Sequence, residues 1–173
     1  MIGIIKINLC NIQKNWLFLN KLSDKNTETG AVIKANAYGL GANEIALALW
    51  EIGNKSFFVA TLEEAIQINE ILPKKRKIYI LNGYNKSYKT AFCEFNFIPV
   101  LNSPLQLTSF IENHPNAYSC IQIDIGMRRL GFQLNQLKKY DAEIKKLNLD
   151  LILGHLSSAI DNDEITNNLQ LEL

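Results

Sequence analysis

Short apolar runs alternate with amphipathic segments along most of this chain. The runs are rich in β-branched and aromatic residues and predict buried strands, whereas the segments between them have helical spacing of apolar positions. Alternation of apolar and polar residues predicts a short strand at 2–9. Six buried strands are then expected at 31–35, 56–60, 78–81, 97–101, 118–125 and 151–155. Helices are expected at 11–22, 43–52, from 61 to before Pro73, at 87–94, 103–113 and 135–147, and from 163 onward.

Alternating strands and helices with short connections predict parallel strands joined by right-handed crossovers, which is an α/β fold. Two arrangements satisfy this pattern: an open doubly wound sheet and part of a (β/α)₈ barrel. The chain contains neither a G-x-G-x-x-G sequence nor a Walker loop, so nucleotide-binding open sheets lose support. The pattern alone leaves both arrangements open.

One lysine interrupts the apolar run at 31–35. Lys34 follows two β-branched residues, and Gly39 and Gly41 then predict a tight turn before a helix capped by Asn43. A buried lysine is costly unless it is neutral or paired, and a neutral amine can condense with an aldehyde. The alternative is a lysine whose amine simply reaches solvent at the strand end. The residue pattern alone favours that alternative.

Composition narrows the class of protein. The 173 residues suffice for one domain, and the 47% hydrophobic and 20% charged residues are typical of a soluble globular protein. A net charge of +1 gives no reason to expect nucleic acid or a membrane as partner. Three distant cysteines, Cys10, Cys93 and Cys120, predict neither a disulfide framework nor a metal site. With no signal peptide or apolar span visible, we expect a cytoplasmic protein.

The lysine segment carries a family resemblance. Residues 32–41 read Val-Ile-Lys-Ala-Asn-Ala-Tyr-Gly-Leu-Gly and closely resemble the pyridoxal phosphate (PLP) attachment motif of bacterial alanine racemases. The resemblance implies that Lys34 forms a Schiff base with PLP and that Tyr38 reaches the cofactor phosphate. Leu40 stands where the family often has histidine.

A second motif follows the expected strand at 118–125. Residues 124–132 read Asp-Ile-Gly-Met-Arg-Arg-Leu-Gly-Phe and resemble the family sequence Asp-x-Gly-Met-x-Arg-x-Gly. Arg129 would then bind the phenolic oxygen of PLP and orient the substrate carboxylate, whereas without the motif a solvated loop is the alternative. Asp124 is open to a structural role. Gln122 occupies the position of a lysine that the family often carbamylates, and its amide could accept a hydrogen bond but has no charge.

The last resemblance lies near the end of the chain. Residues 154–161 read Gly-His-Leu-Ser-Ser-Ala-Ile-Asp and resemble the family segment Thr-His-Phe-Ala-x-Ala-Asp. His155 would sit beside the cofactor ring, although a lone histidine in an apolar strand is more often a core residue. His114 precedes Pro115 and is expected at the surface.

The resemblance favours the barrel over the open sheet. It implies that residues 1–173 form a partial N-terminal PLP-binding (β/α)₈-barrel domain, incomplete with about six of eight strands. The C-terminal β-domain of the family is absent from the sequence, and the full-length family is expected to be homodimeric.

The implied function is interconversion of L-alanine and D-alanine, supplying D-alanine for peptidoglycan. Lys34 would be the base on one face of the substrate. The opposite base, a tyrosine, comes from the missing β-domain, so these residues alone are expected to be inactive. A non-catalytic PLP-binding barrel of the cofactor-homeostasis type and a remnant without function are the alternatives. A substrate other than alanine also remains open.

Overall fold

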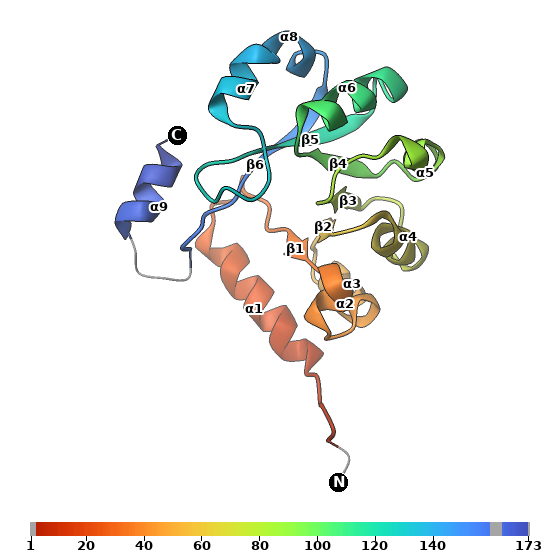
Figure 1. Cartoon of the computed structure of the whole chain (residues 1–173). Helices are drawn as coiled ribbons and strands as arrows, with labels where there is room; N and C mark the ends of the chain where they lie inside the picture. The colour runs from red at the N-terminus through yellow and green to blue at the C-terminus, as the bar shows by residue number, and fades with distance from the viewer. Residues whose placement is uncertain (1–2, 160–163, 173) are drawn as a thin grey trace. The chain divides into compact units, whose positions relative to one another are not determined.

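The computed structural model describes residues 3–159 and 164–172, which form two compact units. The first unit ends at Ile80 and the second begins at Leu81. Each unit has three parallel strands with helices between them (Figure 1). The α/β alternation expected from the apolar pattern is therefore confirmed.

In the first unit the strands pair in the order β1–β2–β3. Its elements are α1 (Leu9–Leu22), β1 (Ala31–Val32), α2 (Lys34–Tyr38), α3 (Ala42–Glu51), β2 (Ser56–Val59), α4 (Leu62–Ile71) and β3 (Lys77–Ile80). The core is apolar and includes Ile33, Ile45, Leu49, Phe57, Val59, Ile68 and Ile78. Helix α1 lies beside α3 (Figure 1). The Gln13 side chain of α1 donates a hydrogen bond of 2.8 Å to the Ala48 carbonyl of α3.

In the second unit the strands pair in the order β4–β5–β6. Its elements are a 3₁₀ turn (Lys86–Tyr88), α5 (Lys89–Phe95), β4 (Ile98–Leu101), α6 (Pro104–Asn113), β5 (Tyr118–Ile123), α7 (Leu134–Lys139), α8 (Asp141–Ile144), β6 (Asn148–Gly154) and α9 (Glu164–Leu171). Its core includes Phe92, Val100, Leu107, Phe110, Cys120, Ile121 and Phe132. The single helix expected at 135–147 is divided at Tyr140 into α7 and α8.

The expectation of a strand at 2–9 is wrong for residues 3–9. Ile2 lies outside the described residues. Residues 3–8 are not in a strand, and α1 begins at Leu9 with the Asn8 side chain accepting the Asn11 N–H at 3.2 Å. Ile4 and Ile5 are 92% and 86% exposed. Alternation makes a strand only where a neighbouring strand supplies hydrogen bonds and covers one face, and no described strand does so here.

The expectation that His114 lies at the surface is also wrong. Its side chain is 6% exposed, stacked on Phe110 with ring centroids 5.1 Å apart. Its Nε2 lies 3.1 Å from the Tyr84 hydroxyl, and its Nδ1 lies 3.6 Å from the Cys93 sulfur. Burial, together with the charge of Lys89, lowers the pKa of His114. Proline at the next position breaks the helix but says nothing about which way the preceding side chain points.

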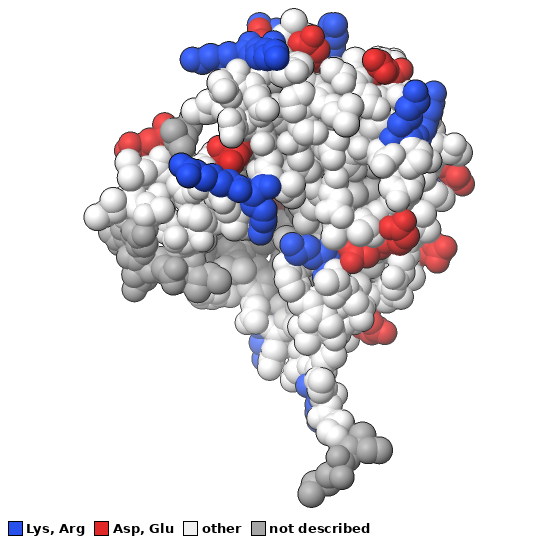
Figure 2. Space-filling view, in the orientation of Figure 1, with Lys and Arg blue, Asp and Glu red and all other residues white. Residues whose placement is uncertain are grey.

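Charged side chains are dispersed on the face drawn in Figure 2. Basic and acidic residues lie there in small groups of either sign, in keeping with the net charge of +1. Among the described residues, no helix has both the length and the apolar character needed to cross a membrane.

Candidate active site

Lys34 opens a left-handed turn just past β1, and we call residues 34–39 the lysine turn. The four residues 35–38 all have φ between 51° and 57°. This conformation costs most L-residues about 1–2 kcal/mol, so the three residues other than Asn36 together store about 3–6 kcal/mol. Strain of this size persists only where the surroundings impose the conformation, and such places are commonly functional.

Asn36 braces the lysine turn from within. Its Oδ1 accepts the Ala42 N–H at 2.8 Å, and its carbonyl accepts the N–H groups of Gly39 and Gly41 at 3.1 and 3.0 Å. Asparagine tolerates left-handed angles better than most residues do. Asn36 therefore caps α3, so the expectation that Asn43 is the cap is wrong.

Glu64 braces the same turn from outside. Its Oε1 accepts the Ala35 N–H at 2.8 Å, and its Oε2 accepts the Ala60 N–H at 2.7 Å. Thr61 and Glu64 form one half of a capping box, because the Thr61 hydroxyl accepts the Glu64 N–H at 3.4 Å. The carboxylate, however, bonds to groups outside the box.

The Lys34 side chain is half-buried and lies beside an exposed tyrosine. Its Nζ is 6.0 Å from the centroid of the Tyr38 ring, and Tyr38 is 64% exposed. No described carboxylate forms an ion pair with Lys34. No described carboxylate therefore holds this amine in an ion pair, which would favour the protonated form that cannot attack an aldehyde.

The second unit presents residues 124–131, which we call the arginine loop, between β5 and α7. Phe132 closes its base by donating its N–H to Gln122 O at 2.8 Å and accepting the Asp124 N–H at 2.9 Å. Gly131 has φ 112°, and a Cβ there would lie 2.8 Å from the backbone nitrogen of Asp124. Only glycine satisfies both the angle and this close approach.

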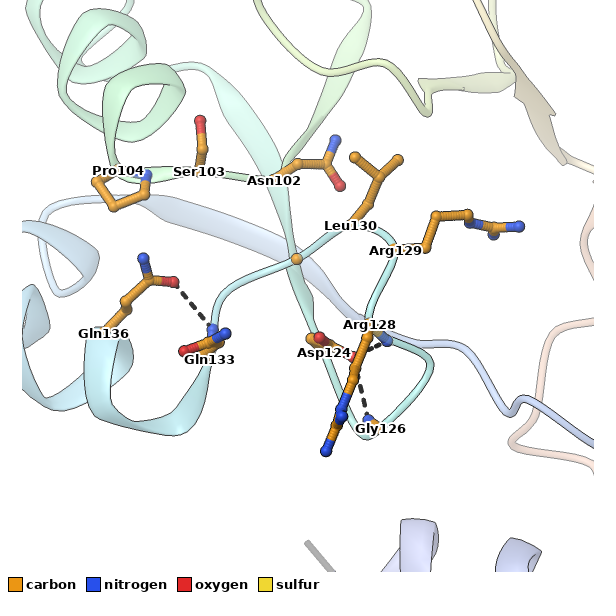
Figure 3. A pocket seen from close by; sticks show the side chains of 11 residues that line it. Asn102, Ser103, Pro104, Asp124, Gly126, Arg128, Arg129, Leu130, Gln133 and Gln136 are labelled. Carbon is orange, nitrogen blue, oxygen red and sulfur yellow. Dashed lines mark hydrogen bonds between the residues drawn. The ribbon is translucent and has the colours of Figure 1, made fainter.

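Asp124 organises the arginine loop by hydrogen bonds. Its Oδ1 accepts the N–H groups of Gly126 and Arg128 at 3.1 and 2.9 Å (Figure 3). Arg128 has φ 54°, so this carboxylate stabilises a left-handed residue in the arginine loop as well. Asp124 therefore has the structural role that the sequence left open: it holds the backbone of the arginine loop.

Arg129 is exposed and lines a cavity of about 560 Å³ in the second unit. Arg128 lines the same cavity, and the two side chains extend in different directions from the loop (Figure 3). Neither guanidinium forms an ion pair with a described carboxylate. Their charges therefore make the cavity suited to an anionic group such as a carboxylate.

The Gln122 side chain supports the arginine loop by binding a backbone carbonyl of the loop. The buried side chain donates from Nε2 to the Leu130 carbonyl at 3.3 Å. No hydrogen bond joins it to Arg129 within the described residues. The amide thus fixes the residue after Arg129 rather than the guanidinium itself.

Gln170 connects α9 to two segments of the site. Its buried side chain donates to Ile125 O at 3.0 Å and accepts the Ser157 N–H, also at 3.0 Å. His155 is the first residue after β6 and has an exposed side chain. Of the motif around His155, residues 160–161 lie outside the described residues.

The structure thus places Lys34 and Tyr38 side by side in the first unit, and Arg129 and His155 at or after strand ends in the second. Their roles toward a cofactor stay predictions. Sequence reasoning missed the bracing by Asn36, the long-range bonds of Glu64 and the connection by Gln170. The spacing of Thr61 and Glu64 is typical of a helix start and does not indicate a bond to residue 35. Nothing near Gln170 in the sequence marks its partners.

Comparison with known proteins decides the family. The model of the alanine racemase N-terminal domain matches residues 7–173. The chain belongs to this alanine racemase family. An alanine racemase of Cereibacter sphaeroides is 34% identical over 167 residues, covering 96% of this chain and 48% of the relative. A catabolic alanine racemase of Agrobacterium fabrum is 33% identical over 176 residues, covering 98% of this chain and 45% of the relative.

Solved alanine racemases have the same fold. The Bartonella henselae alanine racemase, crystallised with covalently bound pyridoxal phosphate, is 35% identical with a TM-score of 0.88, covering 96% of this chain and 48% of that one. The biosynthetic alanine racemase of Pseudomonas aeruginosa is 28% identical with a TM-score of 0.81, covering 94% and 46%. The expected fold class, an incomplete barrel of the alanine racemase N-terminal type, is confirmed. The chain spans about half the length of the alanine racemases it matches.

Proposed function

We propose that the chain is the N-terminal, PLP-binding part of a racemase that interconverts L-alanine and D-alanine. The observation that carries this proposal is the lysine turn: an amine without an ion pair among described residues, on a strained backbone braced by two side chains. The names of the relatives support alanine as the substrate.

The residues present fit the cofactor. Lys34 would attach it, Tyr38 would donate a hydrogen bond to its phosphate, and Arg129 would bind its phenolic oxygen and the substrate carboxylate. His155 would lie beside its ring. When bound, PLP acts as an electron sink that acidifies the Cα–H of an amino acid.

Inversion at Cα needs a proton taken from one face and delivered to the other. Lys34 would take or give the proton on one face, because its amine is neither buried deeply nor paired with a described carboxylate. No second base is proposed within residues 1–173. We therefore propose that these residues alone do not racemise alanine, and that activity requires a partner segment and homodimerisation as expected for the full-length family.

Trapping with borohydride tests the cofactor assignment. The chain is mixed with PLP and reduced, and the peptide carrying the pyridoxyl group is identified by mass spectrometry. We expect one adduct, on Lys34, which Lys34→Ala abolishes and Lys55→Ala leaves intact, since Lys55 lies over the Trp50 ring at 3.5 Å instead. Adducts scattered over many lysines, or none, would contradict the proposal.

A non-catalytic PLP carrier would pass the trapping test, so a second measurement is needed. In D₂O with PLP and L-alanine, a racemase fragment that retains one base should exchange the Cα hydrogen of alanine for deuterium. A carrier should leave it unexchanged. NMR of the recovered alanine distinguishes the two.

The physiological direction is tested in cells. We propose that the product D-alanine enters peptidoglycan, although some relatives are named catabolic. Co-expression of the chain with the second half of a related racemase should restore growth of a D-alanine auxotroph. Restored activity in extracts without growth in the absence of D-alanine would contradict the biosynthetic role.

A further inference from the structure

Glu64 makes an unusual pair of hydrogen bonds. Its two carboxylate oxygens accept backbone N–H groups from Ala35 and Ala60 at 2.8 and 2.7 Å, and Ala35 is 29 residues away in sequence. A glutamate at the third position of a helix usually turns back to the N–H of the capping residue, which here is Thr61. The carboxylate instead joins the lysine turn to the end of β2.

The group that Glu64 holds is the peptide bond that leaves Lys34. The Ala35 N–H belongs to the peptide unit between Lys34 and Ala35, so a fixed hydrogen bond to it fixes ψ of Lys34. On the other side, the Ile33 N–H bonds to Phe58 O of β2 at 2.9 Å. The backbone is thus held on both sides of the Lys34 Cα, which sets the direction of the side chain relative to β2. An error of about 1 Å in the placement of a reacting group is enough to slow a reaction substantially.

Only a carboxylate meets both donors. Each of its oxygens is an acceptor, whereas an amide would turn an NH₂ group toward one of the two N–H groups. The position in the first turn of α4 also favours a negative charge, because the unpaired N–H groups of the helix end point toward it. Glu63, the preceding residue, offers the same charge in the same turn but no such bonds to the lysine turn.

We propose that Glu64 is a positioning residue for Lys34, which aims the amine by holding the backbone on which the lysine stands. Glu64 acts through the Ala35 peptide and does not touch the reacting atoms. The inference rests on the proposed function, since it assigns Glu64 to the lysine that would carry PLP. It adds to that function a residue outside the three motifs of the sequence.

Three variants of the 173-residue chain test the inference. Glu64→Gln keeps the size of the side chain but presents an NH₂ group to one donor. Glu64→Asp keeps both acceptors and withdraws them by one methylene. Glu63→Gln is the matched control, since it removes one negative charge from the same helical turn. Circular dichroism and urea unfolding establish that each variant folds.

The first measurement is amide hydrogen exchange at Ala35 and Ala60 by NMR, which requires no cofactor. We expect both amides to be protected in the unsubstituted chain. Glu64→Gln should speed exchange at Ala35 by about 10- to 100-fold, as the loss of a hydrogen bond to a charged group implies. Glu63→Gln should leave Ala35 protected. Unchanged protection in Glu64→Gln would overturn the inference.

The second measurement is the rate of borohydride-trapped pyridoxyl adduct formation at Lys34. Glu64→Gln should lower this rate by about tenfold relative to adducts at other lysines. Glu64→Asp should restore part of it, which a merely structural role would not require. Trapping at the normal rate despite fast Ala35 exchange would overturn the positioning role.

Failure of the proposed function gives a different pattern. If the unsubstituted chain forms no adduct at Lys34, the proposed cofactor role is wrong, and the exchange data at Ala35 still decide whether Glu64 holds the turn. If Glu64→Gln does not fold, Glu64→Asp decides the question. Exchange and trapping equal to those of the unsubstituted chain would then overturn the inference.

Discussion

The lysine turn and the arginine loop solve the same structural problem in different ways. Each follows a parallel strand, contains left-handed residues other than glycine, and is held by a carboxylate that accepts two backbone N–H groups. In the arginine loop the carboxylate is Asp124, whose partners lie two and four residues further on. In the lysine turn it is Glu64, which reaches the turn from α4, 29 residues away.

The difference separates local from tertiary specification. The arginine loop closes through hydrogen bonds among its own residues and with Phe132. Most of its conformation is therefore determined by residues close together in the sequence. The lysine turn keeps its angles only if α4 and β2 are already in place. We therefore expect the lysine turn to form later in folding and to respond to changes in distant residues.

Glycine substitutions should give the largest contrast. Gly131→Ala forces a Cβ to within 2.8 Å of the Asp124 nitrogen at φ 112°, and we expect it to destabilise the chain by about 3 kcal/mol. Gly39→Ala meets no atom within 4 Å at φ 85°, so only the backbone angle should cost, about 1 kcal/mol. Urea unfolding of the two variants measures the difference. Equal losses would mean that the close backbone approach does not control the arginine loop.

Removing the connection through Gln170 should show whether the arginine loop is as self-contained as its own bonds suggest. Gln170→Ala deletes the bonds to Ile125 O and Ser157 N–H, which we expect to cost about 1–2 kcal/mol. Hydrogen exchange should rise about tenfold over α9 and only slightly over residues 124–131. Asn168→Ala, on the same helix, is the control. Loss of protection throughout the loop would show that it too depends on a distant residue.

The strain in the lysine turn predicts an inverted effect of glycine. Ala35→Gly should stabilise the chain by about 0.5–1 kcal/mol, because glycine accepts left-handed angles without cost. Ala91→Gly, within the right-handed helix α5, should destabilise it by about 1 kcal/mol. Thermal unfolding compares the two. A loss of stability in both variants would contradict the left-handed turn.

The smallest expected effect is a dependence of stability on pH. It arises from His114 in the core of the second unit and not from the lysine turn or the arginine loop. The pKa of His114 is lowered from its ordinary value of 6.5, mainly by burial. Because folding lowers this pKa, the unfolded chain binds the proton at a higher pH than the folded chain does. The stabilisation that neutral His114 contributes is therefore complete above about pH 6.5 and is lost as pH falls through the folded-state pKa. Urea unfolding should show stability declining as pH falls below about 6.5.

One histidine variant provides the comparison. His114→Gln should flatten this decline with pH, because it removes the imidazole whose pKa burial lowers. The slope with pH is the quantity compared, since His114→Gln also removes packing against Phe110. A decline that persists in His114→Gln would assign the titration to another group.

Features that depend on neighbouring residues were predictable from the sequence. The runs around Phe57, Ile78 and Ile121 became strands within one or two residues of their expected ends, because burial of a short apolar run is a local property. The two specific motifs located the lysine turn and the arginine loop. Asp124 was also predictable in kind, since aspartate commonly accepts N–H groups within its own turn.

Features that depend on distant residues were not predictable from the sequence. Nothing in residues 34–38 alone shows a left-handed turn, because alanine favours the right-handed helix and the strain is imposed by Glu64 and by the Asn36 cap. The burial of His114 depends on Tyr84, thirty positions away. The strand expected at 2–9 failed for the same reason, since its alternation could not say whether a neighbouring strand was present.

The angles at Ala35 are those of a right-handed helix reflected in a mirror. They are therefore the angles that a D-amino acid prefers. Because the Ala35 side chain is exposed, a chain assembled by chemical ligation could carry D-alanine at this one position without disturbing the core. Such a chain would relax the backbone without the added freedom of glycine, and comparison with Ala35→Gly would separate strain from flexibility as the property that the site needs.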